Sequence, residues 1–322
     1  MQEIHSGLPQ IQWDENQLKI AGHMLQGRPW AMFQQALGRQ VFWAESSSWS
    51  WLGIVVKTRG IKYLYVPYGP TVSSELSLDE ALDSLKMAAK ELKLDFIRCE
   101  PNGVQTDLVH RTGFIKVRSV QPQESLIIDL TQDLEILRTN LSSSHRNTIN
   151  GAERRGLVLR SSINPSDIEI FLSLMHATAD SRSFHAYPDS YYRTLVETLM
   201  PNGNAMFFLA EYQGKIASAT LCMDYQRTRA YAYTGNDPGL RQLRATAPLV
   251  WKIILDSKQA GFERFDLWGI APLNADKNHP WAGFSEFKRS FGGRDVFYSG
   301  TWELPINRLK YRAYRLAKKA MK

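Results

Sequence analysis

The two halves of the chain repeat one order of predicted elements, and this repeat limits the possible folds more than any other feature. In the first half, strand-like apolar runs at 40–45, 51–59 and 61–67 precede a helical pattern at about 78–93, a strand at 95–100, a short helix at 104–112 and a strand that begins at Gly113. In the second half, predicted strands at 205–212, 215–224 and 229–234 precede a helix at 247–260, a strand at 264–269, a helix at 281–290 and a strand at 295–304.

Each half therefore consists of three strands, a helix, a strand, a helix and a strand. A three-stranded meander that leads into an α/β crossover predicts a mixed sheet in each half, and hence an α/β (α+β) protein. This order resembles the acyltransferase fold of the GNAT N-acetyltransferases. The helix at 247–260 has Thr246 as its predicted N-cap and Gly261 as its stop.

The loop before this helix departs from the GNAT pattern. GNAT enzymes bind the acyl-CoA pyrophosphate on a glycine-containing loop at the start of the equivalent helix. Here the matching stretch is "GLRQLRATAP" (239–248), with Ala245 at the first glycine position. Without glycine the close approach of backbone to phosphate is hindered. The chain thus resembles a GNAT relative that has lost ordinary acetyl-CoA binding.

Seven further stretches, in order along the chain, resemble the FemXAB peptidoglycan-bridge aminoacyltransferases. They are "YLYVPYGP" (63–70), "VQPQESLIIDLTQDLEIL" (120–137), "HRNTINGAERRGL" (145–157), "SRSFHAYPDSYY" (181–192), "YAYTGND" (231–237), "FDLWGI" (265–270) and "GFSEFKRSFGG" (283–293). The resemblance implies two tandem GNAT-like domains and transfer of an amino acid from aminoacyl-tRNA. The acceptor would be the stem-peptide side-chain amine of a peptidoglycan precursor, either UDP-MurNAc-pentapeptide or lipid II.

We expect domain 1 to span 1–132, completed by a helix at 304–322, and domain 2 to span 133–303. No segment shows sustained heptads. The chain is therefore similar to the compact members of the family that lack a coiled-coil arm.

The stretch "FSEFKRSFGG" (284–293) supplies the catalytic candidates. Helical spacing predicts that Phe284, Phe287 and Phe291 share a face. By resemblance, Phe287 and Lys288 border the channel for the acceptor and the tRNA end. Attack of an amine on an aminoacyl ester builds an oxyanion, which the Lys288 cation would stabilise. Phe287 would offer a flat surface to a ribose or base and keep water from the lysine. The alternative is a surface lysine beside a core phenylalanine.

Four residues are candidates for binding substrate. By resemblance, Arg182, Tyr187 and Tyr233 line the acceptor site, where an arginine would suit the diphosphate. Both tyrosines could equally be aromatics at the edge of the core. Glu100 matches an acidic family residue, and we expect it to orient the acceptor ammonium. A general base that takes the proton of the amine and an exposed charge at a strand end are the alternatives.

The C-terminal segment 308–322 carries seven basic residues and no acid, which equals the entire net charge of +7. We expect an apolar face to dock on the protein, composed of Leu309, Ala313, Leu316, Ala317 and Ala320. The cations, with Arg315, Lys318 and Lys319 as the main candidates, would then bind tRNA phosphates, with anionic lipid as the competing partner. A helix that only completes the fold is the third interpretation.

The remaining composition excludes several classes of chemistry. The histidines and two cysteines lack the spacing of a metal site, and nucleotide-binding and serine-hydrolase motifs are absent. We therefore expect no metal and no cofactor other than aminoacyl-tRNA as co-substrate. The N-terminus lacks the pattern of a signal peptide, which suggests a cytoplasmic protein. We also expect a monomer. A GNAT-type acyl-CoA N-acyltransferase is the first alternative function, and a basic module that binds RNA or a membrane surface is the second.

Overall fold

A computed structural model describes the chain except for residues 1–2, 104–112, 183–184, 277 and 321–322, and the side chains of 319 and 320. The chain divides into two units, one of residues 1–123 with 297–322 and the other of residues 124–296. The predicted boundaries were 132/133 and 303/304. Residues 124–132, predicted in domain 1, belong to the second unit, and residues 297–303, predicted in domain 2, belong to the first. The helix predicted at 104–112 lies outside the described residues.

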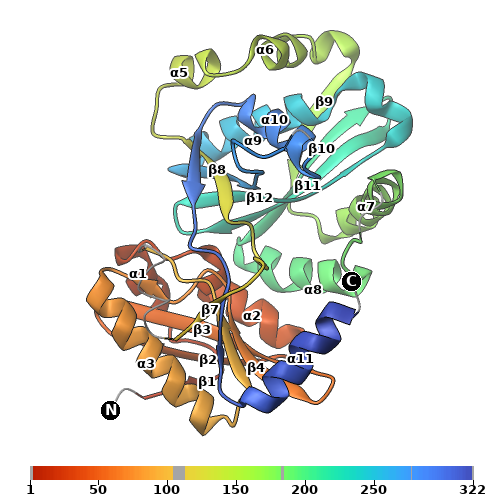
Figure 1. Cartoon of the computed structure of the whole chain (residues 1–322). Helices are drawn as coiled ribbons and strands as arrows, with labels where there is room; N and C mark the ends of the chain where they lie inside the picture. Colours follow the sequence, from red (N-terminus) through yellow and green to blue (C-terminus); the bar gives the residue numbers. More distant parts are fainter. Residues whose placement is uncertain (1–2, 104–112, 183–184, 277, 321–322) are drawn as a thin grey trace. The chain divides into compact units, whose positions relative to one another are not determined.

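The first unit contains one mixed sheet with helices on both faces (Figure 1). Its elements are β1 (His5–Ser6), α1 (Trp13–Lys19), the 3-10 helix η1 (Met24–Gln26), α2 (Arg28–Ala36), β2 (Gln40–Glu45), β3 (Trp49–Thr58), β4 (Ile61–Val66), β5 (Thr71–Val72), α3 (Glu75–Glu91), β6 (Phe96–Cys99), β7 (Ile115–Lys116), β15 (Trp302–Pro305) and α11 (Arg308–Ala320). The strand order is β1-β2-β3-β4-β6-β15-β7, with β5 beside β3. Only β4 and β6 are parallel neighbours in this order.

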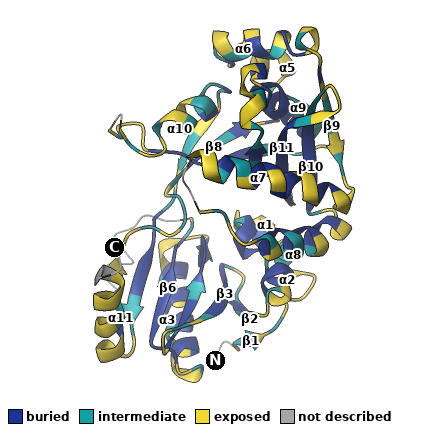
Figure 2. Ribbon diagram, turned by 90° about the vertical axis from the view of Figure 1, so that its right-hand side faces the viewer, coloured by how far each residue is buried: buried dark blue, intermediate teal, exposed yellow. Residues whose placement is uncertain are grey.

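Alternation along the strands sends side chains to two separate cores. On one face, Leu64, Ile97 and Cys99 pack under α3. On the other face, Tyr63 and Phe96 pack with the first residues of α11, and a tryptophan-rich cluster packs against α2. The buried face of α3 recurs every three to four residues, which is the amphipathic pattern that the sequence predicts. Figure 2 shows this central layer as buried.

The second unit repeats the arrangement. Its elements are β8 (Glu124–Asp129), α5 (Leu134–Thr139), α6 (Ser143–Asn150), β9 (Leu157–Ser162), α7 (Ile168–Arg182), α8 (Asp189–Leu199), β10 (Ala205–Tyr212), β11 (Lys215–Tyr225), β12 (Thr228–Asn236), α9 (Thr246–Gln259), β13 (Arg264–Gly269), α10 (Ala282–Arg289) and β14 (Arg294–Phe297). The strand order is β14-β8-β13-β12-β11-β10-β9. Helix α9 packs on one face, and α7 and α8 contact the strands of the other.

Each sheet receives one strand from the opposite half of the sequence. β8 follows the first repeat in the sequence but pairs with β13 in the second unit, and β15 follows the second repeat but pairs with β6 in the first. The single strand predicted at 295–304 is therefore wrong, because the chain leaves one sheet after β14 and enters the other at β15. The break includes Gly300, whose φ of +77° favours glycine and whose added Cβ would lie 2.5 Å from Gln123.

The predicted α/β fold class is confirmed, because each unit is built on a mixed sheet with helices on both faces and the two units repeat one order of elements. Within the described residues the longest helix is α3, with 17 residues, and no helical arm projects from either unit. A search of the described residues finds no helix that combines the length and the apolar character needed to cross a membrane. Cys99 and Cys222 are buried and free.

Candidate active site

The second unit opens between two parallel strands. β12 and β13 pair only along Thr228–Ala230 and Arg264–Asp266. β12 then continues to Asn236 as a partner of β11 alone, while β13 bulges between Asp266 and Gly269 and holds Trp268 at a φ of +63°. The carboxyl ends of the two strands therefore separate, and in open α/β sheets this is the edge at which ligands bind.

The side chain of Lys288, on α10, reaches the end of β13. Its Nζ donates a hydrogen bond of 2.7 Å to the Gly269 carbonyl oxygen, and its side chain is buried. The ammonium also lies 4.9 Å from the centre of the Phe284 ring, one helical turn earlier on α10. Lys288 is thus a fixed, desolvated cation, and the alternative of a surface lysine is excluded.

Burial disfavours the charges on both ionisable groups of this site. Loss of solvation lowers the pKa of Lys288 to about 8, and the nearby Asp266 carboxylate, which raises this pKa, offsets only part of the effect. Burial raises the pKa of Asp266, which the hydrogen bonds from Ser125 and from the Trp268 backbone N–H partly offset. With a pKa near 8, Lys288 is mainly cationic at pH 7 but loses its charge within a moderately alkaline range.

The ring that lies over the Lys288 ammonium is that of Phe284 and not that of Phe287, which was expected to keep water from the lysine. Contact of Phe287 with a ribose or base stays a prediction. Phe287 is half-buried and packs against His145 and Phe291, with ring centroids 5.1 and 5.3 Å away. The three phenylalanines do not form one face because α10 ends at Arg289, so that Phe291 lies beyond the helix. Phe284 instead shares the face of Lys288, four residues on.

His145 on α6 is a residue of this region that sequence analysis missed. Its ring packs against Phe287 and Phe291, and burial lowers its pKa. Its Nε2 has no hydrogen-bond partner among the described residues. The signal was available, because His145 opens one of the stretches that carry the family resemblance.

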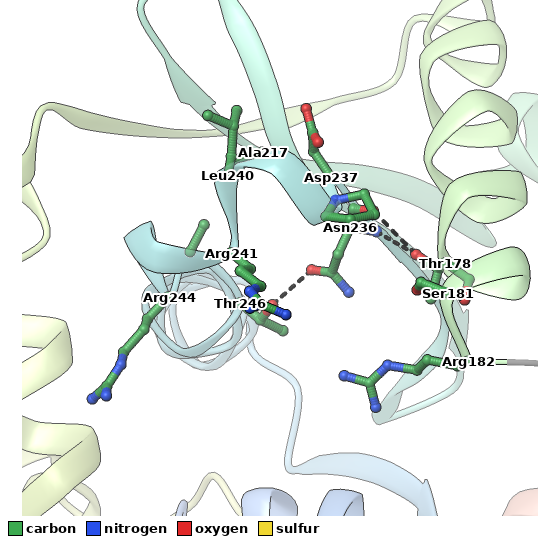
Figure 3. Close-up of a pocket in the computed structure, with 12 residues that line it drawn as sticks. Thr178, Ser181, Arg182, Ala217, Asn236, Asp237, Leu240, Arg241, Arg244 and Thr246 are labelled. Carbon is green, nitrogen blue, oxygen red and sulfur yellow. Dashed lines mark hydrogen bonds between the residues drawn. The ribbon is translucent and has the colours of Figure 1, made fainter.

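Arg182 lines a pocket at the carboxyl end of β12 (Figure 3). This cavity of about 350 Å³ lies between the end of α7 and the start of α9, and Thr178, Ser181, Arg182, Ala217, Asn236, Asp237, Pro238, Leu240, Arg241, Arg244, Ala245 and Thr246 line it. Thr246 Oγ1 donates to Asn236 Oδ1 (2.7 Å), which turns the Asn236 amide nitrogen toward the cavity. The pocket thus combines an amide donor with the N-terminal end of α9.

Three arginines make this pocket cationic. Arg182, Arg241 and Arg244 are exposed, and their guanidinium groups form no ion pair with another described residue. The one acid of the lining, Asp237, accepts a hydrogen bond from the Gly239 backbone N–H. Arginine side chains and a helix N-terminus are both suited to phosphate groups. In the sequence this loop stands out by its missing glycines, whereas its two arginines give no signal on their own.

The predicted tyrosines meet in one cluster. Tyr187 is 54% exposed and stacks on Tyr191, with ring centroids 4.1 Å apart. The Tyr233 hydroxyl lies 3.0 Å from that of Tyr191, and burial raises the pKa of Tyr233 well above its usual value. Tyr192 packs edge-on against both predicted residues. Tyr187 therefore offers a free aromatic surface, whereas Tyr233 is an aromatic at the edge of the core.

Glu100 lies in the first unit and is 2% exposed. Its Oε1 accepts hydrogen bonds from the Gln121 N–H and the Thr301 hydroxyl, and its Oε2 accepts them from the Tyr65 hydroxyl and the Tyr68 N–H. A carboxylate has about four acceptor positions, and all are occupied. Glu100 is therefore neither an exposed charge nor free to orient an ammonium, and its role is structural.

The basic residues of α11 also lie in the first unit. Arg315 makes an ion pair of 3.4 Å with Glu303, and Lys318 lies 5.9 Å from the Tyr314 ring. The side chain of Lys319 is outside the described part. The expected docking face is wrong, because Leu309 and Leu316 are 79% and 69% exposed and Tyr311 is the buried residue of the helix. Binding of tRNA by these cations stays a prediction.

Three solved structures illustrate the fold. The crystal structure of FemX superposes with a TM-score of 0.82 at 17% identity, over 96% of this chain and 99% of that one. L-PGS from Bacillus licheniformis gives 0.58 at 15% identity, over 98% and 97%. A tandem GNAT protein from the clavulanic acid biosynthesis pathway gives 0.53 at 13% identity, over 94% and 98%.

The comparison with curated proteins returned no match. The model of the FemAB family matches residues 109–216 and 211–319, which together span well over half of the chain. This match agrees with the FemXAB resemblance of the seven sequence stretches and with the tandem acyltransferase fold. The chain is a member of the FemAB family.

Proposed function

We propose that the protein transfers an amino acid from aminoacyl-tRNA to the side-chain amine of the stem peptide of a peptidoglycan precursor. The observation that carries this proposal is the buried Lys288 cation at the split between β12 and β13, in a chain of the FemAB family. The arginine pocket lies at the same edge of the sheet, because Asn236 ends β12 as Gly269 ends β13.

Lys288 would act on the transition state. The acceptor amine attacks the ester carbonyl carbon, and the carbonyl oxygen becomes an oxyanion. The C–N bond then forms fully, the ester C–O bond breaks, and the proton lost by the amine goes to the leaving ribose oxygen. A preorganised cation beside the oxyanion contributes on the order of 10²–10³ in rate. Since Gly269 and Phe284 hold the ammonium in place, little reorganisation is needed when the charge develops.

The arginine pocket would bind substrate phosphates. We assign it to the diphosphate of the acceptor, UDP-MurNAc-pentapeptide or lipid II, with Tyr187 as an aromatic surface. Arg182→Ala should raise the KM for the acceptor by roughly tenfold, the effect of losing one charged hydrogen-bond donor, and leave the KM for aminoacyl-tRNA unchanged. Arg241→Ala should act in the same direction. A rise only in the KM for aminoacyl-tRNA would assign the pocket to the donor instead.

The decisive experiment is mass spectrometry of both acceptors after incubation with the protein, tRNA, synthetases and mixed amino acids. We expect a mass increase of one amino-acid residue on the stem peptide, and no increase after RNase treatment. An unchanged precursor under all conditions would contradict the proposal.

An acyl-CoA N-acyltransferase is the alternative, because α9 begins at the position where GNAT enzymes hold a pyrophosphate and this position is cationic here. Labelled acetyl-CoA tests it directly. Saturable binding of acetyl-CoA, together with acyl transfer that survives RNase, would favour this alternative.

A further inference from the structure

The rotation of α11 about its own axis is fixed by a buried network in the first unit. Arg98 and Glu303, on the neighbouring strands β6 and β15, form a buried ion pair with an N–O distance of 2.5 Å. Tyr311 donates its hydroxyl hydrogen bond to Glu303 (2.7 Å), and Tyr314 accepts one from Arg98 (3.0 Å). Both tyrosine rings also pack on Phe96, with centroids 5.4 and 5.2 Å away. The inward face of the helix is therefore aromatic and polar.

The opposite face of α11 is apolar and exposed. Leu309 and Leu316 are seven residues apart, which is two helical turns, and their side chains are 79% and 69% exposed. Ala313 is exposed on the same side, and the exposed Arg308 and Arg312 flank it. Figure 2 shows almost all of the described part of α11 as exposed. The leucines that the sequence suggested as a docking face thus point away from the protein.

Cations and apolar groups continue from the helix into a neighbouring groove. This groove, of about 510 Å³, is lined by Leu316, Arg315 and Lys318 of α11 and by Arg118 and Val120, which is 46% exposed. The ion-paired Arg98 and Glu303 also line it, and Arg315 pairs with Glu303, so the unpaired cations of the groove are Arg118 and Lys318 among the described residues. Helix α11 has no acidic residue, and the segment 308–322 holds as many cations as the whole net charge of the chain. The surface is therefore apolar along its crest and positive on its flanks.

We propose that the outer face of α11 and this groove bind the surface of a membrane that contains anionic phospholipid. At such a surface leucines enter the boundary between headgroups and acyl chains, while arginines and lysines meet the lipid phosphates. RNA would use the cations alone and gain little from two exposed leucines. This inference is independent of the proposed transfer reaction, since vesicle binding requires no substrate.

The test is co-sedimentation of the full chain with vesicles. Vesicles of phosphatidylglycerol mixed with phosphatidylcholine should bind the protein, and vesicles of phosphatidylcholine alone should bind it at least tenfold more weakly. The double variant Leu309→Gln, Leu316→Gln keeps the charge and the helix propensity, and should reduce partition by about tenfold. The matched control is Leu76→Gln, because Leu76 is 73% exposed on α3 of the same unit, beside acidic residues. It should bind within twofold of the wild type.

A second variant separates lipid from the other partners. Arg312→Gln with Lys318→Gln should also weaken vesicle binding, by roughly tenfold or more. The proposal is overturned if the wild-type chain does not prefer anionic vesicles. It is also overturned if the leucine variant binds vesicles normally while the charge variant loses tRNA binding, which would assign the surface to RNA. A change from dimer to monomer in the leucine variant, with vesicle binding intact, would assign it to a second copy of the chain.

Discussion

The two units use the same strand pair in opposite ways. In the first unit, β4 and β6 stay paired from Tyr63–Phe96 to Val66–Cys99, and the Glu100 N–H adds hydrogen bonds to the Val66 and Gly69 carbonyls. In the second unit, β12 and β13 separate after three residue pairs. The first pair ends at Glu100, a carboxylate whose acceptor positions are all occupied. The second pair ends beside the desolvated ammonium of Lys288, which α10 supplies. The repeat thus duplicates the fold, but only the second unit keeps an open strand end.

This difference also separates stability from function. Glu100 is a buried charge that the surrounding donors fully compensate, so it holds the first unit together. Lys288 is a buried charge with a lowered pKa, so its environment disfavours the form that the proposed chemistry needs. Groups that are costly to keep charged in the folded state are typical of functional sites. Substitutions at Lys288, Glu100 and Asp266 test this contrast.

Replacement of Lys288 by methionine should lower the rate of transfer by about two to three orders of magnitude. Methionine keeps most of the side-chain volume but removes the cation, so the loss reports on charge in the transition state. The matched control is Lys258→Met, because Lys258 Nζ also donates to backbone carbonyls, those of Leu130 and Gln132, in the same unit. Steady-state kinetics should show the control within about twofold of the wild type, and near-normal turnover by Lys288→Met would end the oxyanion role.

Glu100→Gln should lower the free energy of unfolding by about 3 kcal/mol, because a neutral amide cannot accept all four hydrogen bonds. Urea unfolding followed by tryptophan fluorescence measures the change. Glu91→Gln, at an exposed position on α3, is the control and should stay within about 0.5 kcal/mol. If Glu100→Gln is as stable as the wild type but loses acceptor affinity, Glu100 belongs to the site after all.

Lys288→Met should have the opposite effect on stability. The unfolded chain binds this proton up to a pH of about 10.5, whereas the folded chain releases it above about 8. The charged lysine therefore costs about 3 kcal/mol below pH 8, and this cost disappears as the pH rises from 8 to 10.5. The variant also loses the hydrogen bond to Gly269, which offsets part of this cost. We therefore expect the free energy of unfolding of Lys288→Met to exceed that of the wild type by about 2 kcal/mol at pH 7. Urea unfolding at pH 7 and pH 10 should show the gain at the lower pH only.

The charged fraction of Lys288 should fall roughly tenfold between pH 8 and pH 9.3, so the rate of transfer, divided by the fraction of acceptor amine that is neutral at each pH, should fall by the same factor. Asp266 supports the charged form of the lysine, so Asp266→Asn should move this decrease to a lower pH. The asparagine can still accept the hydrogen bonds from Ser125 and Trp268. The pH profile of kcat/KM measures both effects. An identical profile for the variant would show that another group titrates.

Much of the fold follows from local pattern. The strands at β2, β4, β10 and β13 and the helix α10 occur within a residue or two of their predicted positions, because period-two and period-3.6 patterns are written in neighbouring residues. The predicted single strand at 295–304 failed for a different reason. Both β14 and β15 have strand character, but only long-range pairing with β8 and β6 shows that they belong to separate sheets.

The candidate site divides in the same way. Lys288 was found from its motif, and the structure places its ammonium at the end of β13. Its catalytic role stays a prediction. Phe284 was overlooked as its partner, because the family motif drew attention to Phe287. Arg241 and Arg244 were visible in the loop before α9 but have meaning only beside Arg182, which comes from a distant helix.

The repeat, the family resemblance, the tandem fold and Lys288 as a candidate were all readable in the order of residues along the chain. Which charges are free and which surfaces are covered depended on contacts in three dimensions. The acceptor positions of Glu100 are occupied by hydrogen-bond donors that include Thr301, which is distant in the sequence. The leucines of α11 face outward because Tyr311, on the opposite face, is hydrogen-bonded to Glu303. Periodicity shows that a helix has two faces, but only contacts between residues far apart in the chain decide which face is buried.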